Sequence, residues 1–125
     1  SIWHCLWRII MASTFKNVGA TLGQASGAAA NIYTAGGSVT AVVHAMYVSN
    51  LSSTNTINAN VQVSTDGGST FYYVGKSLQV TTNNTMVLDK PINLENNDIL
   101  RCWVDPLADS STPSAEVYAS ILEIS

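Results

Sequence analysis

The side chains able to do acid, base or nucleophilic chemistry are few in this chain, and their spacing matches no catalytic arrangement. The two histidines are His4 and His44, and nucleophilic catalysis would need one of them beside a Ser or Cys and an orienting acid. His44 lies inside a strongly apolar run, where a lone histidine is more often a core or interface residue than a base. Cys102 alternates with Leu100 and Val104, which predicts a buried and inert thiol.

The acidic side chains offer no evident pair for glycoside hydrolysis, which needs two carboxyl groups about 5 to 9.5 Å apart. Most carboxylates lie in or beside sequence turns, where such groups satisfy local backbone amides. They are Asp66, Asp89, Glu95, Asp98, Asp105, Asp109, Glu116 and Glu123. No spacing of Cys and His fits a zinc site, and no phosphate loop or nucleophile elbow is present. We therefore expect a non-enzyme with no catalytic residue, metal or cofactor.

One short motif resembles a known sequence signature. Residues 64–71 read STDGGSTF and resemble the Asp-box, a hairpin signature repeated around the propellers of sialidases and other glycan-active proteins. A propeller needs at least about four four-stranded blades, which 125 residues with a single copy of the motif do not supply. We interpret the stretch as a structural β-turn made by Asp66, Gly67 and Gly68. Asp66 and Gly67 tolerate positive φ, and the Asp66 carboxylate can accept backbone amide hydrogen bonds across the turn.

The composition restricts the kinds of partner. Only 10% of the residues are charged and the net charge is -3, against about 25% charged residues in an average domain. Ser, Thr and Asn take their place. Such a surface suits an assembly whose subunits cover one another, because each buried ion would cost desolvation energy. No basic patch exists for nucleic acid, and the longest apolar run is shorter than the roughly 20 residues that span a membrane. We therefore expect neither nucleic acid nor a membrane as a partner.

The two cysteines, Cys5 and Cys102, give no framework of bridges. We interpret both as free thiols, which fits a reducing site of synthesis.

From residue 13 onward the apolar residues recur with a period of two, which is typical of strands. Eight short strands separated by turn residues predict an all-β fold, an antiparallel β-sandwich of the jelly-roll or immunoglobulin-like kind. The expected strands are 14–22, 29–34, 39–49, 57–64, 71–80, 86–94, 99–105 and 115–124. We expect one sandwich domain over residues 13–125.

Two of these strands carry patterns that predict their position. The run 39–49 is apolar on both faces and should be a central strand. One of its faces holds Val39, Ala41, Val43, Ala45 and Tyr47, and the other holds Val42, His44, Met46 and Val48. The run 57–64 alternates cleanly and should have one wet face. Its inward residues are Ile57, Ala59, Val61 and Val63, and its outward residues are Asn58, Asn60, Gln62 and Ser64.

Residues 1–12 form a separate apolar arm in this prediction. Its first ten residues read SIWHCLWRII, with tryptophans four positions apart and apolar residues almost all round. The arm either packs on its own sandwich, or a sheet edge, or inserts into a neighbouring subunit, where Trp and Arg are typical anchors. The candidate interface residues are Trp3, Leu6, Trp7, Ile9 and Ile10.

From Met11 to the end, the chain resembles a family of small virion structural proteins of tailed phages, especially phages of cyanobacteria and other marine bacteria. Four stretches carry the likeness: FKNVGATLG, IYTAGGSVTAVVHAMYVSNLSSTN, TMVLDKPINLENNDILRCWV and the closing ASILEIS. The arm is not part of the family pattern.

The resemblance implies a structural role without chemistry, most concretely decoration or cementing of a capsid. Copies would sit on the outer capsid surface and clamp neighbouring major capsid proteins. The implied partners are the major capsid protein and copies of the chain itself, and a trimer would suit a seat on a local three-fold axis.

Two alternatives stay open from the sequence. A tail baseplate or fibre component would also use a rigid β-module. A carbohydrate-binding module for host attachment is suggested by Phe71, Tyr72 and Tyr73 beside the Asp-box-like turn, since sugars dock on exposed aromatic faces. In a strand Tyr72 lies on the face opposite to Phe71 and Tyr73. Tyr72 and Tyr73 are the candidate glycan-facing residues.

Overall fold

The computed structural model describes residues 13–24, 29–109 and 111–124. Within these ranges the chain forms ten strands and no helix, which confirms the all-β prediction. The strands are β1 (Ser13–Phe15), β2 (Val18–Thr21), β3 (Ala30–Thr34), β4 (Thr40–Asn50), β5 (Ile57–Ser64), β6 (Phe71–Val80), β7 (Thr85–Leu88), β8 (Ile92–Leu94), β9 (Ile99–Val104) and β10 (Ala115–Ile124).

Ten strands appear in place of the expected eight because two of the predicted runs are each interrupted. The run 14–22 splits into β1 and β2, and both halves pair with β10. The run 86–94 splits into β7 and β8, and both halves pair with β4. Pro91 lies in the second break, where its missing N–H would otherwise interrupt a ladder. Each pair of half-strands therefore occupies one strand position, and the fold has eight such positions.

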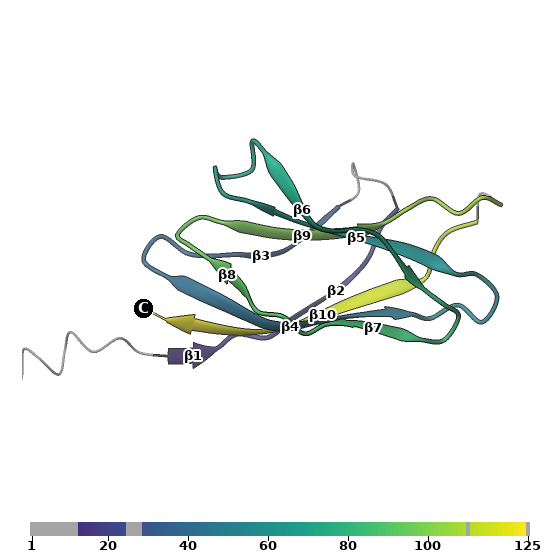
Figure 1. Ribbon diagram of the computed structural model, residues 1–125, viewed down its shortest axis with the longest axis horizontal. Coiled ribbons are helices and arrows are strands. Elements are labelled where there is room, and N and C mark those ends of the chain that lie inside the picture. The colour runs from purple at the N-terminus through teal and green to yellow at the C-terminus, as the bar shows by residue number, and fades with distance from the viewer. Residues whose placement is uncertain (1–12, 25–28, 110, 125) are drawn as a thin grey trace, which may run out of the picture.

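The strand order is that of a jelly roll. The six-stranded sheet, here sheet I, has the order β1-β10-β4-β7, with β2 also beside β10 and β8 beside β4. The four-stranded sheet, here sheet II, has the order β3-β9-β5-β6. Counted as eight positions, the first pairs with the last, the second with the seventh, the third with the sixth and the fourth with the fifth. This nested antiparallel pairing excludes the immunoglobulin-like alternative. Figure 1 shows the two sheets as facing layers.

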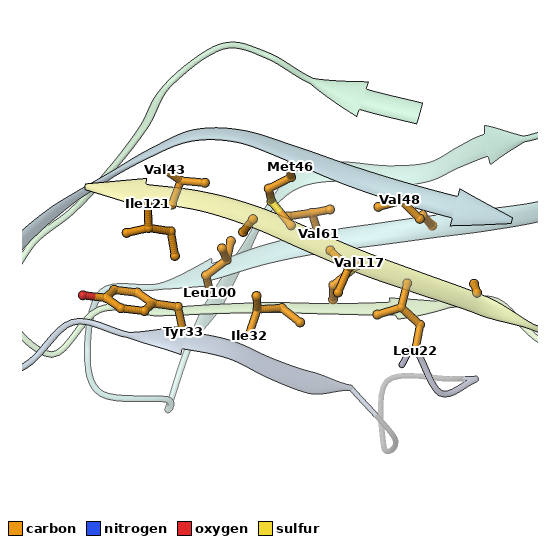
Figure 2. Packing of buried hydrophobic residues seen from close by; sticks show 14 of the residues in the cluster. Leu22, Ile32, Tyr33, Val43, Met46, Val48, Val61, Leu100, Val117 and Ile121 are labelled. Atoms are coloured by element: carbon orange, nitrogen blue, oxygen red, sulfur yellow. The ribbon is translucent and has the colours of Figure 1, made fainter. Parts of the chain in front are cut away.

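The core fills the space between the sheets. Figure 2 shows Val43, Met46, Val48, Val117 and Ile121 of sheet I facing side chains of sheet II, among them Ile32, Val61 and Leu100. Met46, Val48, Val61, Leu100 and Ile121 have no solvent-accessible surface. Apolar burial of this kind is the main favourable term in folding.

One polar contact joins the sheets at an end of the core. The hydroxyl of Tyr33 on β3 donates a hydrogen bond to the Glu123 carboxylate on β10. Burial of Tyr33, together with this bond to Glu123, raises the pKa of the phenol well above its usual range. The phenol therefore stays protonated as the donor.

A β-bulge in β4 overturns the predicted division of its faces. Ser120 of β10 lies opposite Ala45, but the next residue, Ile121, lies opposite Val43, so His44 has no partner. The extra residue moves the alternation by one position. Ala41 and Val43 point into the core before the bulge, and Met46 and Val48 do so after it. His44 itself is exposed, so of its two predicted places the core is excluded and an interface stays a prediction. The central position of the strand is confirmed.

The wet face predicted for β5 was also wrong. Asn60, Gln62 and Ser64 are 1%, 6% and 0% exposed, because side chains of the neighbouring strands and the following turn cover them. Ile57, Ala59 and Val61 are buried in the core, as predicted.

The arm predicted at residues 1–12, with its candidate interface residues, lies outside the described residues. No helix in the described part of the chain is long and apolar enough to cross a membrane.

Replacing Met46 with Ala should lower the free energy of unfolding by about 2–5 kcal/mol, because it leaves a cavity between the sheets. Urea denaturation measures the change. Val87→Ala removes a side chain that is 48% exposed on the same sheet and serves as the matched control, with a much smaller loss. Equal losses for the two variants would contradict the assigned core.

Candidate interaction surfaces

The described residues do not bring catalytic groups together. No group of three or more His, Cys, Asp or Glu side chains that could hold a metal ion occurs among them. The carboxylates of Asp66, Asp98 and Asp109 accept backbone amide hydrogen bonds within their own turns. Cys102 is fully buried, and burial raises the pKa of its thiol to about 12. A thiol with this pKa is unreactive near neutral pH. Cys5 and His4 lie outside the described residues.

The Asp-box-like stretch is the turn between β5 and β6. The Asp66 carboxylate accepts hydrogen bonds from the backbone N–H of Thr70 at 2.8 Å and of Ser69 at 3.0 Å, and from the Ser64 hydroxyl at 2.8 Å. Gly67 and Gly68 have φ angles of 80° and 109°, which other residues rarely adopt. The hydrogen bonds, led by that from Thr70, lower the pKa of Asp66 to about 2. Asp66 and Gly68 therefore make hydrogen bonds within the turn, and Gly67 and Gly68 supply its positive φ angles.

The outer face of sheet II is covered by a stack of aromatic and cationic side chains, here the aromatic cluster: Phe71, Tyr73, Arg101 and Trp103. The Arg101 guanidinium carbon lies 3.4 Å from the centroid of the Phe71 ring and 5.5 Å from that of Trp103. The rings of Trp103 and Tyr73 are 6.0 Å apart. The Arg101 Nε donates a hydrogen bond to Gln62 at 2.9 Å. Cation–π contacts and this bond hold the cluster over the polar face of β5.

A second network fixes β6 where it bulges. Asn60 donates a side-chain hydrogen bond to the Asp105 carboxylate at 2.9 Å and accepts one from the backbone N–H of Ser77 at 2.9 Å. The Ser77 hydroxyl donates to the other Asp105 oxygen at 2.9 Å. Ser77 has a φ angle of 50°, unusual for a residue other than glycine. Both ends of the Asn60 amide thus have a partner, which accounts for the burial of Asn60.

The two tyrosines proposed to face glycans do not form one platform. Tyr73 lies opposite Gln62 and belongs to the aromatic cluster, with the Lys76 amine 5.4 Å from its ring centroid. Tyr72 lies opposite Val63 on the other face of β6 and is 62% exposed. Contacts with Trp103 and Lys76 leave less of the Tyr73 ring free for stacking. Carbohydrate binding stays a prediction from the sequence, and Tyr72 is the freer ring.

The outer face of sheet I also carries exposed apolar side chains, here in a row across three strands that we call the tyrosine strip: Tyr118, Tyr47 and Val87. They are cross-strand neighbours on β10, β4 and β7 and are 43%, 40% and 48% exposed. The two tyrosine rings lie 6.4 Å apart. Exposed apolar rows of this kind, with tyrosine at their centre, are typical of protein contact surfaces.

A hollow of about 410 Å³ lies beside the strip. Tyr47 and Tyr118 line it together with Gly19, and Glu116 and Ser49 form part of its polar wall. Glu116 is exposed and is the only charged side chain at the outward positions of β10, β4 and β7. A partner at this surface would therefore meet aromatic rings and a single negative charge.

These surfaces were only partly predictable from the sequence. In residues 115–121 the inward alternation of Ala115, Val117, Ala119 and Ile121 places Tyr118 outward, so its exposure was predictable. The exposure of Tyr47 was not predictable, because the β-bulge at His44 reverses the face of the sheet to which Tyr47 points.

Comparison with known proteins supports the fold alone. No family model matches the chain, and no curated protein is similar to it in sequence. Among solved structures, a chain of the infectious bursal disease virus T13 particle is similar, with 11% identity over 90% of this chain and a TM-score of 0.55. The chain spans only 31% of that viral chain.

Two further structures match over nearly their whole length. The capsid of Helicobacter pylori bacteriophage KHP30 contains a chain with 11% identity and a TM-score of 0.50, covering 94% of this chain and 90% of that one. A chain of the disulfide-linked pili of Bacillus endospore appendages has 14% identity and a TM-score of 0.51, covering 90% and 87%. The jelly-roll fold is therefore shared with chains of viral shells and of a pilus.

The pKa of Asp66 gives a testable prediction. Because it lies below its ordinary value of about 3.9, the turn's hydrogen bonds stabilise the fold above pH 4 and are lost as the pH falls through about 2. Ser64→Ala removes one donor and should raise the pKa, as measured by the NMR shift of the Asp66 carboxyl carbon. Ser69→Ala keeps the backbone donor and should leave it unchanged. If Asp66 had the same pKa in the Ser64→Ala and Ser69→Ala variants, the assigned hydrogen bonds would be contradicted.

Asp105→Ala should lower the free energy of unfolding by about 1–3 kcal/mol, since it leaves the buried Asn60 amide without its acceptor. Thermal or urea denaturation measures the loss. Asp89→Ala, at an exposed carboxylate, is the control and should change stability little. A loss no larger than that of the control would show that the network does not stabilise β6.

Proposed function

We propose that this chain is a structural protein of a virion, and more specifically a decoration or cement protein that clamps neighbouring major capsid subunits on the outside of the shell. The observation that carries the proposal is the tyrosine strip, an exposed row of two tyrosines and a valine across three strands of sheet I. Aromatic residues on a rigid sheet bury a large area at low entropic cost, which suits a permanent contact.

Three further features support a structural role. The jelly roll is shared with a phage capsid chain over nearly the whole of both chains. The low content of charged residues suits surfaces that neighbouring subunits cover. The carboxylates with described contacts are bound in turns or structural networks rather than gathered in a cleft. Because jelly rolls also occur in lectins and cupins, the surface rather than the fold has to decide the function.

The proposed mechanism is mechanical. Each copy would place the tyrosine strip against a capsid subunit while sheet II, stabilised by its own aromatic cluster, keeps the sandwich rigid. If one copy contacts several subunits at once, each further contact forms at a high effective concentration. The overall affinity then exceeds that of any single contact, even where each single contact is weak.

Co-sedimentation with separated heads and tails of the parent virion tests the proposal. The protein should bind heads saturably at a fixed ratio to the capsid subunit. A double variant with Tyr47→Ser and Tyr118→Ser should bind about tenfold or more weakly, because it loses two aromatic anchors.

Tyr72→Ser, at an exposed tyrosine on sheet II, is the matched control and should bind like the unaltered protein. Binding to tails alone would place the protein in a baseplate or fibre. Equal binding of the double variant and the control would remove the tyrosine strip from the account.

A further inference from the structure

The outer face of sheet I has more open apolar surface than the strip alone. Phe15, Leu122 and Val42 lie side by side on β1, β10 and β4, at the end of the sheet near the C-terminus. Phe15 is 73% exposed, and Leu122 and Val42 are partly exposed. Their side chains point to the same face as the tyrosine strip, because Ile121 and Val43 beside them point into the core. Within the described residues, two apolar rows are thus exposed on one face, a pattern typical of protein contact surfaces.

We propose that in the free protein this face binds residues 1–12 of a neighbouring copy of the chain, a contact that the capsid subunit of the proposed function would displace. The segment attaches at Ser13, the first residue of β1, and so begins at the edge of sheet I. It carries two tryptophans and four large aliphatic residues: Trp3, Trp7, Ile2, Leu6, Ile9 and Ile10. Twelve residues reach at most about 40 Å when extended, which exceeds the roughly 20 Å between Ile124 and Tyr118 along β10. The segment is therefore long enough to span the distance from the edge of sheet I to the tyrosine strip.

The chemistry of the segment matches that of the face. Residues 1–12 contain Arg8 and no acidic residue, and Glu116 is the single charge at the outward positions of β10, β4 and β7. The hollow of about 410 Å³ beside the tyrosine strip is lined by two aromatic rings and by Glu116. It suits one large indole side chain, whose N–H needs an acceptor when it is buried.

The direction of β1 favours a neighbouring copy over the same copy. Ser13 lies opposite Ile124 and Phe15 opposite Leu122, so β1 runs towards Tyr118. The strand β1 is therefore entered from the end of β10 that lies away from Tyr118. To bind its own strip, residues 1–12 would have to reverse this direction, whereas a copy placed beyond this end would receive them without a turn. Exchange of a terminal segment between identical subunits is a low-cost way to link them.

Site-specific photo-cross-linking of the purified full-length protein tests the inference, with no virion present. Val87→p-benzoylphenylalanine places the probe at the end of the tyrosine strip, and Gln79→p-benzoylphenylalanine places the control on exposed β6 of sheet II. Isotope-labelled and unlabelled copies are mixed before irradiation, and tryptic peptides are identified by mass spectrometry. We expect the Val87 probe to cross-link to residues 1–8 in pairs that join a labelled and an unlabelled copy, and the control to give far fewer.

Adding Glu116→Gln and Tyr118→Ser should lower the cross-link yield severalfold. Cross-links to residues 1–8 only within one copy would overturn the exchange in favour of self-docking. Cross-links to β4 or β10 of a second copy would show that two such faces bind each other. No cross-link above the control would show that the face does not receive the segment. Since no capsid is present, failure here leaves capsid binding to be judged separately.

Discussion

The antiparallel pairing of β10 with β4 is the contact on which the rest of the structure depends. It extends from Ala115 opposite Asn50 to Ile124 opposite Thr40, with one bulge at His44. The half-strands β1 and β2 attach to one side of this pair, and β7 and β8 to the other. Its inward side chains form one wall of the core, and its outward side chains form the tyrosine strip. A slip of one residue would exchange the two sets, so a single register fixes both the core and the proposed contact surface.

The two outer faces of the sandwich differ in how they are covered. On sheet II, Arg101 and Trp103 pack over Asn60 and Gln62, so the chain supplies its own cover there. On sheet I, Tyr47 and Tyr118 are 40% and 43% exposed; on sheet II, Tyr73 is 48% exposed, but its ring is in contact with Trp103 and Lys76. An apolar row exposed to water does not stabilise the isolated fold, whereas its burial by a partner is energetically favourable. The difference between the faces is therefore the main reason for assigning partner contacts to sheet I.

Much of the fold could be predicted from the sequence. The period-two alternation located every strand position, and the run 57–64 matches β5 in both bounds. The prediction failed where tertiary contacts decide. Nothing local to β5 shows that Arg101 and Trp103, some forty positions later, cover its polar face. The bulge at His44 depends on the register with β10, which lies still farther along the chain.

The candidate surfaces were predictable to a smaller extent. The Asp66 turn is local, and its residues act through neighbours within four positions, so the sequence predicted its chemistry. The tyrosine strip joins three strands that are distant in sequence, and only the pairing shows that Tyr47, Tyr118 and Val87 lie side by side. Because the same fold carries many functions, this surface rather than the jelly roll is the basis of the functional account.

Hydrogen–deuterium exchange of the chain, free and bound to heads of the parent virion, tests the central claim most directly. The account predicts that binding slows exchange in β4, β7 and β10, whose outward side chains form the tyrosine strip, while β5, β6 and β9 exchange as in the free protein. Protection confined to β5, β6 and β9 would contradict it, since the contact would then lie on the face that the chain already covers itself.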